Sequence, residues 1–226
     1  MHHPVSLIAG ASGLVGSHIV RELIYNNQAC VLIVRKKISE FDDNTLQLIS
    51  DFSQLSSDLP KRLPPIDHVY LCLGLRLKTQ ELMMMSSERK KEFYKVDFDL
   101  SLELANIAFE NGAKKISIIS AVGADINSLN YYAKIKGKLE KSICKIGYEQ
   151  VIIAQPGHLL GVRNDPRGPE IPFLEAGLEV IKPILQGPLK KFRQISSEKV
   201  AKSLVHEMNL KDNQYSPKFL DYKDFK

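Results

Sequence analysis

The sequence predicts an α/β fold: a doubly wound, mostly parallel sheet with helices on both faces and a small C-terminal segment on the substrate side. Two observations predict it. Short apolar runs typical of buried strands alternate with stretches of helical periodicity along most of the 226 residues. The first run also ends in a glycine-rich turn that leads into a helix. Since strand–helix–strand units pack their helices against a parallel sheet, both faces are expected to be covered.

The stretch VSLIAGASGLVGSHIV at residues 5–20 is the most informative part of the chain. Gly10 is expected to permit a tight turn, Gly13 to let the backbone approach a pyrophosphate, and Gly16 to let the helix pack closely on the strand. Backbone N–H groups and the positive end of the helix would face the anion. The sequence therefore predicts a phosphate-binding turn, completed by Ser12, Leu14 and Val15.

The remaining elements follow in a regular order. Further strands are expected at 29–34, 46–50, 68–74, 115–120 and 150–154. Helices are expected at about 94–111, 131–144, 173–185 and 196–208. Ligands of doubly wound sheets bind at the carboxyl ends of the strands, and the residues at these ends are Gly10, Arg35, Asp51, Gly74, Ser120 and Pro156. We expect one domain over residues 1–226, with 157–226 contributing a cap on the substrate side.

Composition and charge disfavour several classes of protein. The net charge is +5, but basic residues are interspersed with acidic ones. The densest cluster, residues 89–91, is flanked by Glu88 and Glu92, which favours a solvated helix face over a nucleic-acid surface. The three cysteines form no CxxC pair, so neither a disulfide framework nor a zinc site is indicated. Without a membrane-length apolar run or a signal peptide, we expect a cytoplasmic protein with no membrane partner.

A serine, a tyrosine and a lysine in the second half of the chain point to proton-transfer chemistry. Ser120 ends a predicted strand, and Tyr132 and Lys136 follow at i, i+4 spacing on one face of a predicted helix. A neighbouring ammonium lowers the pKa of a tyrosine, which is about 10 when free. Tyr132 would then give a proton to a carbonyl oxygen while a hydride reaches the carbon, with Ser120 hydrogen-bonded to the same oxygen. The competing interpretation is an amphipathic helix with a packed tyrosine and an exposed lysine.

With these residues the chain resembles an atypical short-chain dehydrogenase/reductase, similar to the Tat-interacting-protein-like oxidoreductases. The matching stretches cover most of residues 5–161: GASGLVGSHIV, LIVRK, LCLG, FYKVDFDLSLELANIAFENGAKKISIISAVGAD, YYAKIKGKLE and QPGHLLG. The resemblance implies a Rossmann-like domain, an NADP-type cofactor, and catalytic roles for Ser120, Tyr132 and Lys136. It also implies that Lys136 holds the nicotinamide ribose.

The same resemblance places Asp51 beside the adenine of the cofactor, and Leu73 and Gly74 along the adenosine ribose. Two positions depart from the family pattern. The family's Arg-Pro-Gly turn reads Gln155-Pro156-Gly157 here, which alters any polar contact that the arginine makes. The residue after the strand-end serine is Ala121, where relatives can carry a second serine.

Arg35 and Lys36 predict NADP rather than NAD as the cofactor. NAD-selective sites usually place an acidic residue after the second strand, where it binds the ribose 2′-hydroxyl. Here that position reads Val34-Arg35-Lys36-Lys37, and no carboxylate occurs before Glu40. A guanidinium at position 35 can bind a 2′-phosphate with two parallel hydrogen bonds, and Lys36 adds positive charge. The competing interpretation is a pair of exposed loop cations.

The leading hypothesis is an NADP-dependent oxidoreductase acting on a carbonyl or alcohol of a small organic substrate. The second is an NADPH-binding regulatory or scaffold protein with little or no turnover, whose partner would use the predicted helix 173–185. The third is a nucleotide-sugar epimerase, disfavoured because only about seventy residues follow the strand at 150–154. A homodimer is expected on base rates. Segment 75–93 carries no recognised motif, and its three consecutive methionines are either a lid over substrate or packing.

Overall fold

The computed structural model describes residues 4–160, 190, 192–210 and 216–225. Within these residues, seven strands form one sheet in which every neighbouring pair is parallel. Across the sheet they lie in the order β3 (Thr45–Ile49), β2 (Ala29–Val34), β1 (Val5–Ala9), β4 (His68–Leu71), β5 (Lys115–Ile119), β6 (Gln150–Ala154) and β9 (Lys218–Leu220). The chain runs outward from β1 in one direction and from β4 in the other, which confirms the predicted doubly wound α/β fold.

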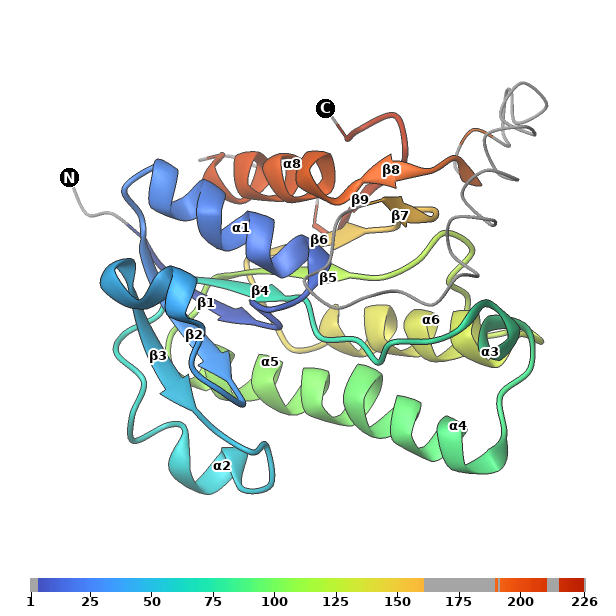
Figure 1. Ribbon diagram of the computed structural model, residues 1–226, viewed down its shortest axis with the longest axis horizontal. Coiled ribbons are helices and arrows are strands. Elements are labelled where there is room, and N and C mark those ends of the chain that lie inside the picture. Colours follow the sequence, from blue (N-terminus) through green and yellow to red (C-terminus); the bar gives the residue numbers. More distant parts are fainter. Residues whose placement is uncertain (1–3, 161–189, 191, 211–215, 226) are drawn as a thin grey trace.

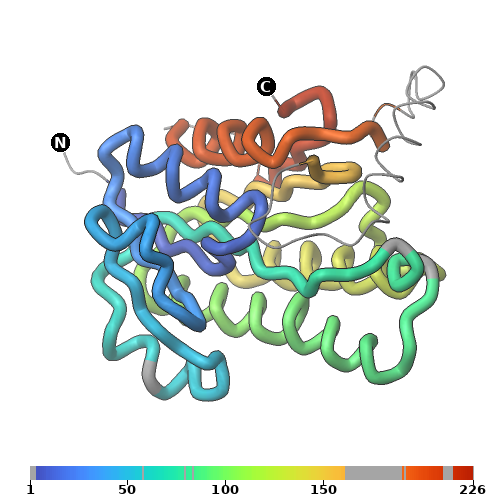
Figure 2. Tube along the Cα trace, viewed as in Figure 1, coloured from blue at the N-terminus to red at the C-terminus, as the bar shows by residue number. Residues whose placement is uncertain are grey.

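Helices cover both faces of the sheet (Figure 1). On one face α1 (Leu14–Tyr25) lies beside α8 (Ser197–Asn209), and on the other α5 (Ser101–Glu110) lies beside α6 (Tyr131–Ile143). The Cα trace shows the first and last of these helices paired although they are far apart in the sequence (Figure 2). The smaller elements are Ser39–Asn44 (a 3₁₀ turn), α2 (Leu55–Asp58), α3 (Thr79–Met83), α4 (Ser87–Tyr94), β7 (Leu159–Leu160) and β8 (Ile195–Ser196).

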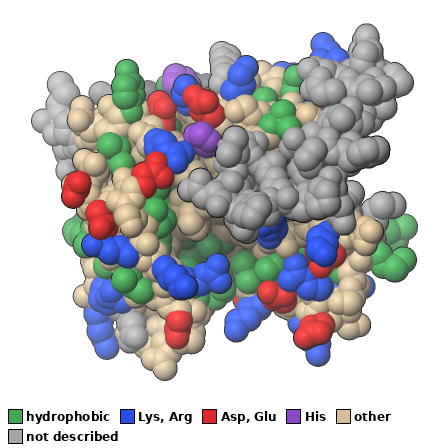
Figure 3. Space-filling view, in the orientation of Figure 1, with side chains coloured by type: hydrophobic (Ala, Val, Ile, Leu, Met, Phe, Trp, Pro, Cys, Tyr) green, Lys and Arg blue, Asp and Glu red, His purple; other side chains and the backbone are tan. Residues whose placement is uncertain are grey.

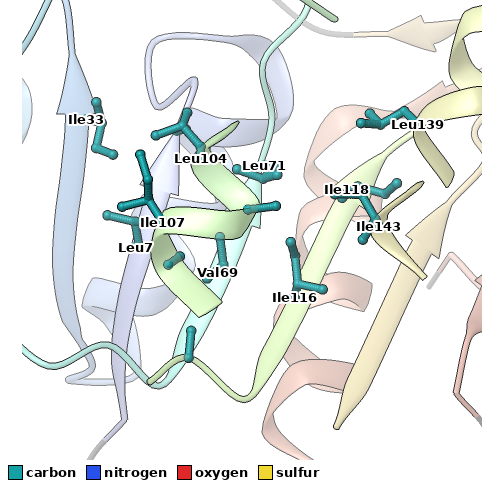
Figure 4. Close-up of a cluster of buried hydrophobic side chains, with 14 of the residues drawn as sticks. Leu7, Ile33, Val69, Leu71, Leu104, Ile107, Ile116, Ile118, Leu139 and Ile143 are labelled. Carbon is teal, nitrogen blue, oxygen red and sulfur yellow. The ribbon is translucent and has the colours of Figure 1, made fainter. Parts of the chain in front are cut away.

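The core lies on both faces of the sheet because strand side chains alternate between them. On one face Leu7, Val69 and Ile116, from three adjacent strands, pack with Leu104 and Ile107 of α5 (Figure 4). The alternate positions of the same strands pack against α1 and α8. Each continuous apolar run is therefore buried on both sides, as expected for a covered parallel sheet.

The helix predicted at 94–111 is part of a longer one. α4 continues through a π-helical segment, Lys95–Leu100, into α5, and the backbone angles stay helical at both junctions. The Ser86 side chain caps its start by accepting a hydrogen bond from the Arg89 N–H. Sequence periodicity misses the first turns because residues 87–92 are all polar and form no apolar stripe.

The C-terminal part of the chain adds a helix and a strand to these layers. α8 matches the helix predicted at 196–208 to within one residue, and it buries Val200, Leu204 and Met208. β9 was not expected, because a strand of three residues is too short to give a periodic signal. The predicted helix 173–185 lies outside the described residues. Within residues 157–226, the segment expected to form the substrate-side cap, α8 and β9 are therefore the longest elements that the structure describes.

The surface carries both signs of charge. Lysine and arginine side chains lie among aspartates and glutamates on the face drawn in Figure 3. Within the basic cluster 89–91, Arg89 is 2.7 Å from Glu81 and also pairs with Glu92, so this segment is a solvated, ion-paired helix face. Among the described helices, none has the length and apolar composition needed to cross a membrane.

Candidate functional site

The β1–α1 turn contains glycines that no larger residue can replace. Gly10 has a φ of 88°, and a Cβ there would lie 2.4 Å from the Cys72 carbonyl oxygen. A Cβ at Gly16 would lie 2.2 Å from the carbonyl oxygen of Gly10. These contacts agree with the tight turn and the close helix packing predicted for the two positions. Ser12 and Gly13, between them, are exposed at the surface.

The N-terminus of α1 lacks a capping side chain. Its N-cap residue is Gly13, and its first turn contains no acidic residue. Leu14 and Val15 are apolar and buried, so this end of the helix offers only its backbone N–H groups as polar partners. The uncompensated positive end of the helix is suited to an anion such as a phosphate.

Two exposed cations follow β2. Arg35 and Lys36 form no ion pair within the part of the chain that the structure describes, whereas Lys37 lies 2.8 Å from Asp42. Because β1, β2 and β3 are parallel and in register, their carboxyl ends lie next to one another. The structure therefore places both cations at the same sheet edge as the glycine turn, where they are able to meet an anionic group.

Asp51 lies at the carboxyl end of β3, beside a cleft. Its Oδ1 accepts hydrogen bonds from the Ser53 N–H at 2.8 Å and the Ser53 hydroxyl at 2.6 Å, which hold the pKa of Asp51 below its usual value. The cleft has a volume of about 310 Å³ and is lined by Ile49, Ser50, Asp51, Ser53, Gln54, Leu55, Leu59 and Arg62. Asp51 is thus exposed and charged at the edge where the sequence predicts a nucleotide.

Leu73, Gly74 and Pro156 also lie at this edge. Leu73 and Gly74 follow β4, which neighbours β1, and Gly74 is exposed. Pro156 follows β6 and is buried, and its carbonyl oxygen accepts a hydrogen bond from the Val122 N–H at 3.0 Å. The structure brings the predicted cofactor-binding residues to one edge of the sheet.

Tyr132 and Lys136 lie one turn apart on α6, as their spacing predicts. The Lys136 Nζ is 6.0 Å from the centre of the Tyr132 ring, and that ring packs against Phe93 at a centroid distance of 5.4 Å. Gly137 lets this helix lie close to the preceding loop, because a Cβ there would be 2.6 Å from backbone atoms of residues 125 and 126. The Tyr132 hydroxyl makes no hydrogen bond with the described residues.

Asp97, which the sequence analysis did not identify, is the direct partner of Lys136. The Lys136 ammonium lies 2.8 Å from the Asp97 carboxylate, and the two side chains are 5% and 2% exposed. Lys136 also donates to the carbonyl oxygen of Ile119 at 3.3 Å, and Asp97 accepts from the Leu75 N–H at 2.7 Å. These contacts fix the pair at the carboxyl ends of β4 and β5.

The pKa of Tyr132 moves opposite to the direction predicted from its spacing to Lys136. Burial and the nearby Asp97 carboxylate raise this pKa, and the Lys136 ammonium opposes them only in part. Burial by itself would lower the pKa of Lys136, but Asp97 raises it above the usual value. The prediction of an acidified phenol is therefore wrong for this form of the protein, because burial outweighs the lowering of the pKa by Lys136 and Asp97 adds to the effect of burial.

Ser120 lies in a different polar cluster from Tyr132. Its hydroxyl donates to the Glu140 carboxylate, which also accepts from the Gln155 side-chain amide at 2.9 Å. Since a helix rises 1.5 Å per residue, Glu140 is about 12 Å further along α6 than Tyr132. The structure thus brings Tyr132, Lys136 and Asp97 together, and it places Ser120 with Glu140 and Gln155.

Asp97 and Glu140 are absent from the sequence prediction for identifiable reasons. Asp97 lies in the π-helical segment, where the wider turn breaks the 3.6-residue period by which a buried helical position is recognised. Glu140 lies one turn after Lys136 and reads as part of a polar helix face. The stretch 93–108 also contains Asp99 and Glu103, so composition gives no signal that singles out Asp97.

The fold, the open glycine turn and the paired tyrosine and lysine together define a dinucleotide-binding α/β protein. The model of the NAD dependent epimerase/dehydratase family matches residues 6–126. The chain belongs to this family, in which NAD(P) binding is typical and whose description names epimerases and dehydratases. Membership confirms the Rossmann-like, nucleotide-binding part of the resemblance seen in the sequence.

Curated relatives include proteins called FMP52, mitochondrial. The chain is 31% identical over 173 residues to the one from Emericella nidulans, which covers 74% of this chain and 71% of the relative. It is 33% identical over 163 residues to the one from Kluyveromyces lactis, covering 70% and 69%. Both names place those relatives in mitochondria.

Solved structures of similar fold include sugar-nucleotide epimerases. A variant of UDP-glucuronic acid 4-epimerase from Bacillus cereus superposes with a TM-score of 0.72 at 16% identity, over 96% of this chain and 76% of that one. UDP-glucose 4-epimerase from Thermotoga maritima gives 0.67 at 18% identity, over 96% and 76%. At this identity the likeness establishes the fold.

Proposed function

We propose that this protein is an NADP-dependent oxidoreductase of the atypical short-chain dehydrogenase/reductase kind. It would transfer a hydride to or from a carbonyl or alcohol carbon of a small organic substrate. The observation that carries the proposal is the position of the Tyr132, Lys136 and Asp97 cluster, anchored to the carboxyl ends of β4 and β5 at the same edge as the glycine turn.

The residues of this edge fit a dinucleotide. The N–H groups of the first α1 turn would bind the pyrophosphate, because no side chain caps them. Arg35 and Lys36 would bind a 2′-phosphate, since neither has an ion-pair partner among the described residues. Asp51, Leu73 and Gly74 would line the adenosine portion, as the resemblance implies. The bound nicotinamide would supply or accept the hydride.

Tyr132 would act as the acid toward the substrate oxygen. The phenol keeps its proton at neutral pH, so a proton is present to donate, but burial and Asp97 raise the pKa of Tyr132 and make it a weaker acid than a free tyrosine. Lys136 stays protonated in its buried position because Asp97 is 2.8 Å away. The buried ammonium would orient a hydroxyl of the cofactor and stabilise the phenolate formed after proton transfer.

The test is NADPH oxidation over a panel of aldehydes and ketones, with Tyr132→Phe compared with Tyr131→Phe. Tyr131 is the matched control because it neighbours Tyr132 in the same helix and its hydroxyl donates to the Lys90 carbonyl oxygen. We expect Tyr132→Phe to lower kcat by at least about 10²-fold, with NADPH affinity unchanged. Wild-type turnover in Tyr132→Phe would rule out this mechanism.

The alternative is an NADPH-binding regulatory or scaffold protein with little turnover. The hydrogen bond from Ser120 to Glu140 supports it, because a serine so engaged has no proton left to donate to a substrate. Tight NADPH binding without turnover over the whole carbonyl panel would favour this function. Capture of a protein partner that depends on NADPH would establish it.

Nucleotide-sugar epimerisation is a further candidate, supported by the fold of the solved epimerases. The Thermotoga maritima epimerase was solved with UDP-glucose, and the Bacillus cereus variant with UDP-4-deoxy-4-fluoro-glucuronic acid and NAD. Incubation with UDP-glucose and UDP-glucuronic acid, followed by proton NMR of the sugar, separates this candidate from net NADPH oxidation. Epimerisation without net change in the cofactor would replace the leading proposal.

We propose a homodimer and a cytoplasmic location with a small-molecule substrate and no nucleic-acid partner. The curated relatives are named mitochondrial, so cell fractionation of the tagged full chain is the deciding measurement for location. Light scattering on the purified protein decides the oligomeric state.

A further inference from the structure

Glu140 is a buried carboxyl group that the proposed mechanism does not use. Its side chain comes from α6, and the residue is 8% exposed. Two donors converge on its Oε1: the Ser120 hydroxyl, from the end of β5, and the Gln155 amide, from the end of β6, at 2.9 Å. Both donors are neutral, so the carboxyl group is hydrogen-bonded without being paired to a cation.

The charged and titratable groups around Glu140 leave it without a dedicated cation. Lys136 is the nearest cation, but its ammonium is engaged by Asp97 at 2.8 Å and by the Ile119 carbonyl oxygen at 3.3 Å. On the other side, Cys144 is a neutral thiol at the C-terminal end of α6, and Glu140 contributes to raising its pKa. Gln155 places a neutral amide against Glu140, so within the described residues no cation is bonded to this carboxyl group.

A serine hydroxyl has one proton, and its neighbour decides where that proton goes. When Glu140 is ionised, Ser120 must donate to it and can only accept a hydrogen bond from a group on its other side. When Glu140 carries a proton, the carboxyl O–H donates to the serine oxygen. The Ser120 proton is then free to point toward a substrate oxygen.

We propose that Glu140 is a positioning residue of the site, whose proton decides whether Ser120 donates a hydrogen bond to a substrate oxygen or accepts one. The inference rests on the proposed function together with the sequence prediction that Ser120 is hydrogen-bonded to the substrate oxygen. Burial raises the pKa of Glu140, and the bonds from Gln155 and Ser120 together with Lys136 oppose this only in part. Glu140 therefore binds its proton more tightly than an ordinary glutamate does.

The first test uses the cofactor-free protein and needs no turnover. A carboxyl group whose pKa is raised in the folded state stabilises the fold at low pH, and this stabilisation is lost as the pH rises through the folded pKa. We expect the free energy of unfolding of the wild type, relative to Glu140→Gln, to fall as the pH rises above about 4.3, the ordinary pKa of a glutamate. The matched control is Glu149→Gln, which changes an exposed glutamate 3.4 Å from Lys114 and keeps the wild-type pH dependence.

Gln155→Arg provides a second comparison that leaves Glu140 in place. The arginine supplies a cation that keeps Glu140 ionised, so the fall in the free energy of unfolding with rising pH is expected to vanish. The infrared C=O stretch of a protonated carboxyl group is expected to vanish as well. Wild-type and Glu140→Gln unfolding free energies that run parallel over this pH range would overturn the proposal. So would a protonated-carboxyl band that persists in Gln155→Arg.

The second test follows the pH profile of kcat/KM with an active carbonyl substrate. We expect the kcat/KM of the wild type to fall with rising pH as Glu140 ionises, because the Ser120 hydroxyl then donates to Glu140 instead of the substrate. In Glu140→Gln this fall is expected to be absent, because the amide keeps donating to Ser120 at every pH. Gln155→Arg is expected to lower kcat by about 10²-fold at all pH values, the effect of removing one donor from a reacting oxygen. If no carbonyl substrate turns over, the proposed function fails while the unfolding and infrared results still decide this inference.

Discussion

The Lys136 ammonium and the Asp97 carboxylate lie 2.8 Å apart, and both side chains are almost inaccessible to solvent. The two residues come from different helical segments, one α-helical and one π-helical, that pack on the same face of the sheet. Burial penalises a charge that stands alone, so the attraction between the two side chains offsets the cost of removing them from water. The pair also acts on Tyr132, whose pKa is raised mainly by burial, lowered by Lys136 and raised by Asp97.

Replacing Asp97 with Asn is expected to destabilise the protein by about 3–5 kcal/mol, because it leaves a buried ammonium without a counter-charge. Urea unfolding at neutral pH measures the loss. The matched control is Asp42→Asn in the exposed pair with Lys37, which is expected to cost at most about 1 kcal/mol. The double variant Asp97→Asn/Lys136→Met should recover part of the lost free energy of unfolding. Equal losses of stability in Asp97→Asn and Asp42→Asn would refute the stabilising role of the buried pair.

Gly16→Ala is expected to lower the free energy of unfolding by about 2 kcal/mol or more, because the new Cβ would meet the Gly10 carbonyl oxygen at 2.2 Å. Gly74→Ala is the control. A Cβ at position 74 would contact only the Asp97 Oδ1, at 3.5 Å. Gly74→Ala should therefore change the free energy of unfolding by no more than about 1 kcal/mol. Thermal or urea unfolding compares the two variants, and a tolerated Gly16→Ala would show that α1 can move away from the turn.

Arg35 and Lys36 are expected to determine the preference for NADPH over NADH. Because hydrogen bonds to charged groups contribute about 1.5–3 kcal/mol, Arg35→Ala/Lys36→Ala should weaken NADPH binding by about 10- to 100-fold. NADH affinity should change little, since NADH lacks the 2′-phosphate. Lys37→Ala is the control, because Lys37 is paired with Asp42. Calorimetric titration measures both cofactors, and an equal loss for NADH would contradict a 2′-phosphate contact.

His68 is expected to make the fold sensitive to mild acid. Burial and the nearby Lys115 lower its pKa to about 4, so the folded state resists protonation more than the unfolded chain does. The stability that depends on a neutral His68 is present above pH 6.5 and is lost as the pH falls toward 4, by up to about 3 kcal/mol. His68→Gln should flatten this part of the stability curve relative to the wild type. The exposed His206→Gln is the control, and parallel curves for His68→Gln and the wild type would contradict the assignment.

Local sequence pattern determined the sheet and its glycine turn. Continuous apolar runs such as residues 29–34 can be buried only by a covered sheet, and the glycines at positions 10, 13 and 16 mark the turn into α1. The i, i+4 spacing likewise determined that Tyr132 and Lys136 share a helix face. These features depend on residues close together in the chain, and their periods are visible in one sequence.

Only the tertiary structure decided which polar groups meet. Asp97 reaches Lys136 because the π-helical segment and α6 pack on the same face of the sheet, and Ser120 meets Glu140 because β5 ends beneath α6. Such contacts join residues far apart in sequence, and the π-helical turn hides the phase of Asp97. The direction of the Tyr132 pKa shift followed from the burial of the phenol in the folded protein, which outweighs the influence of Lys136 that the spacing predicts.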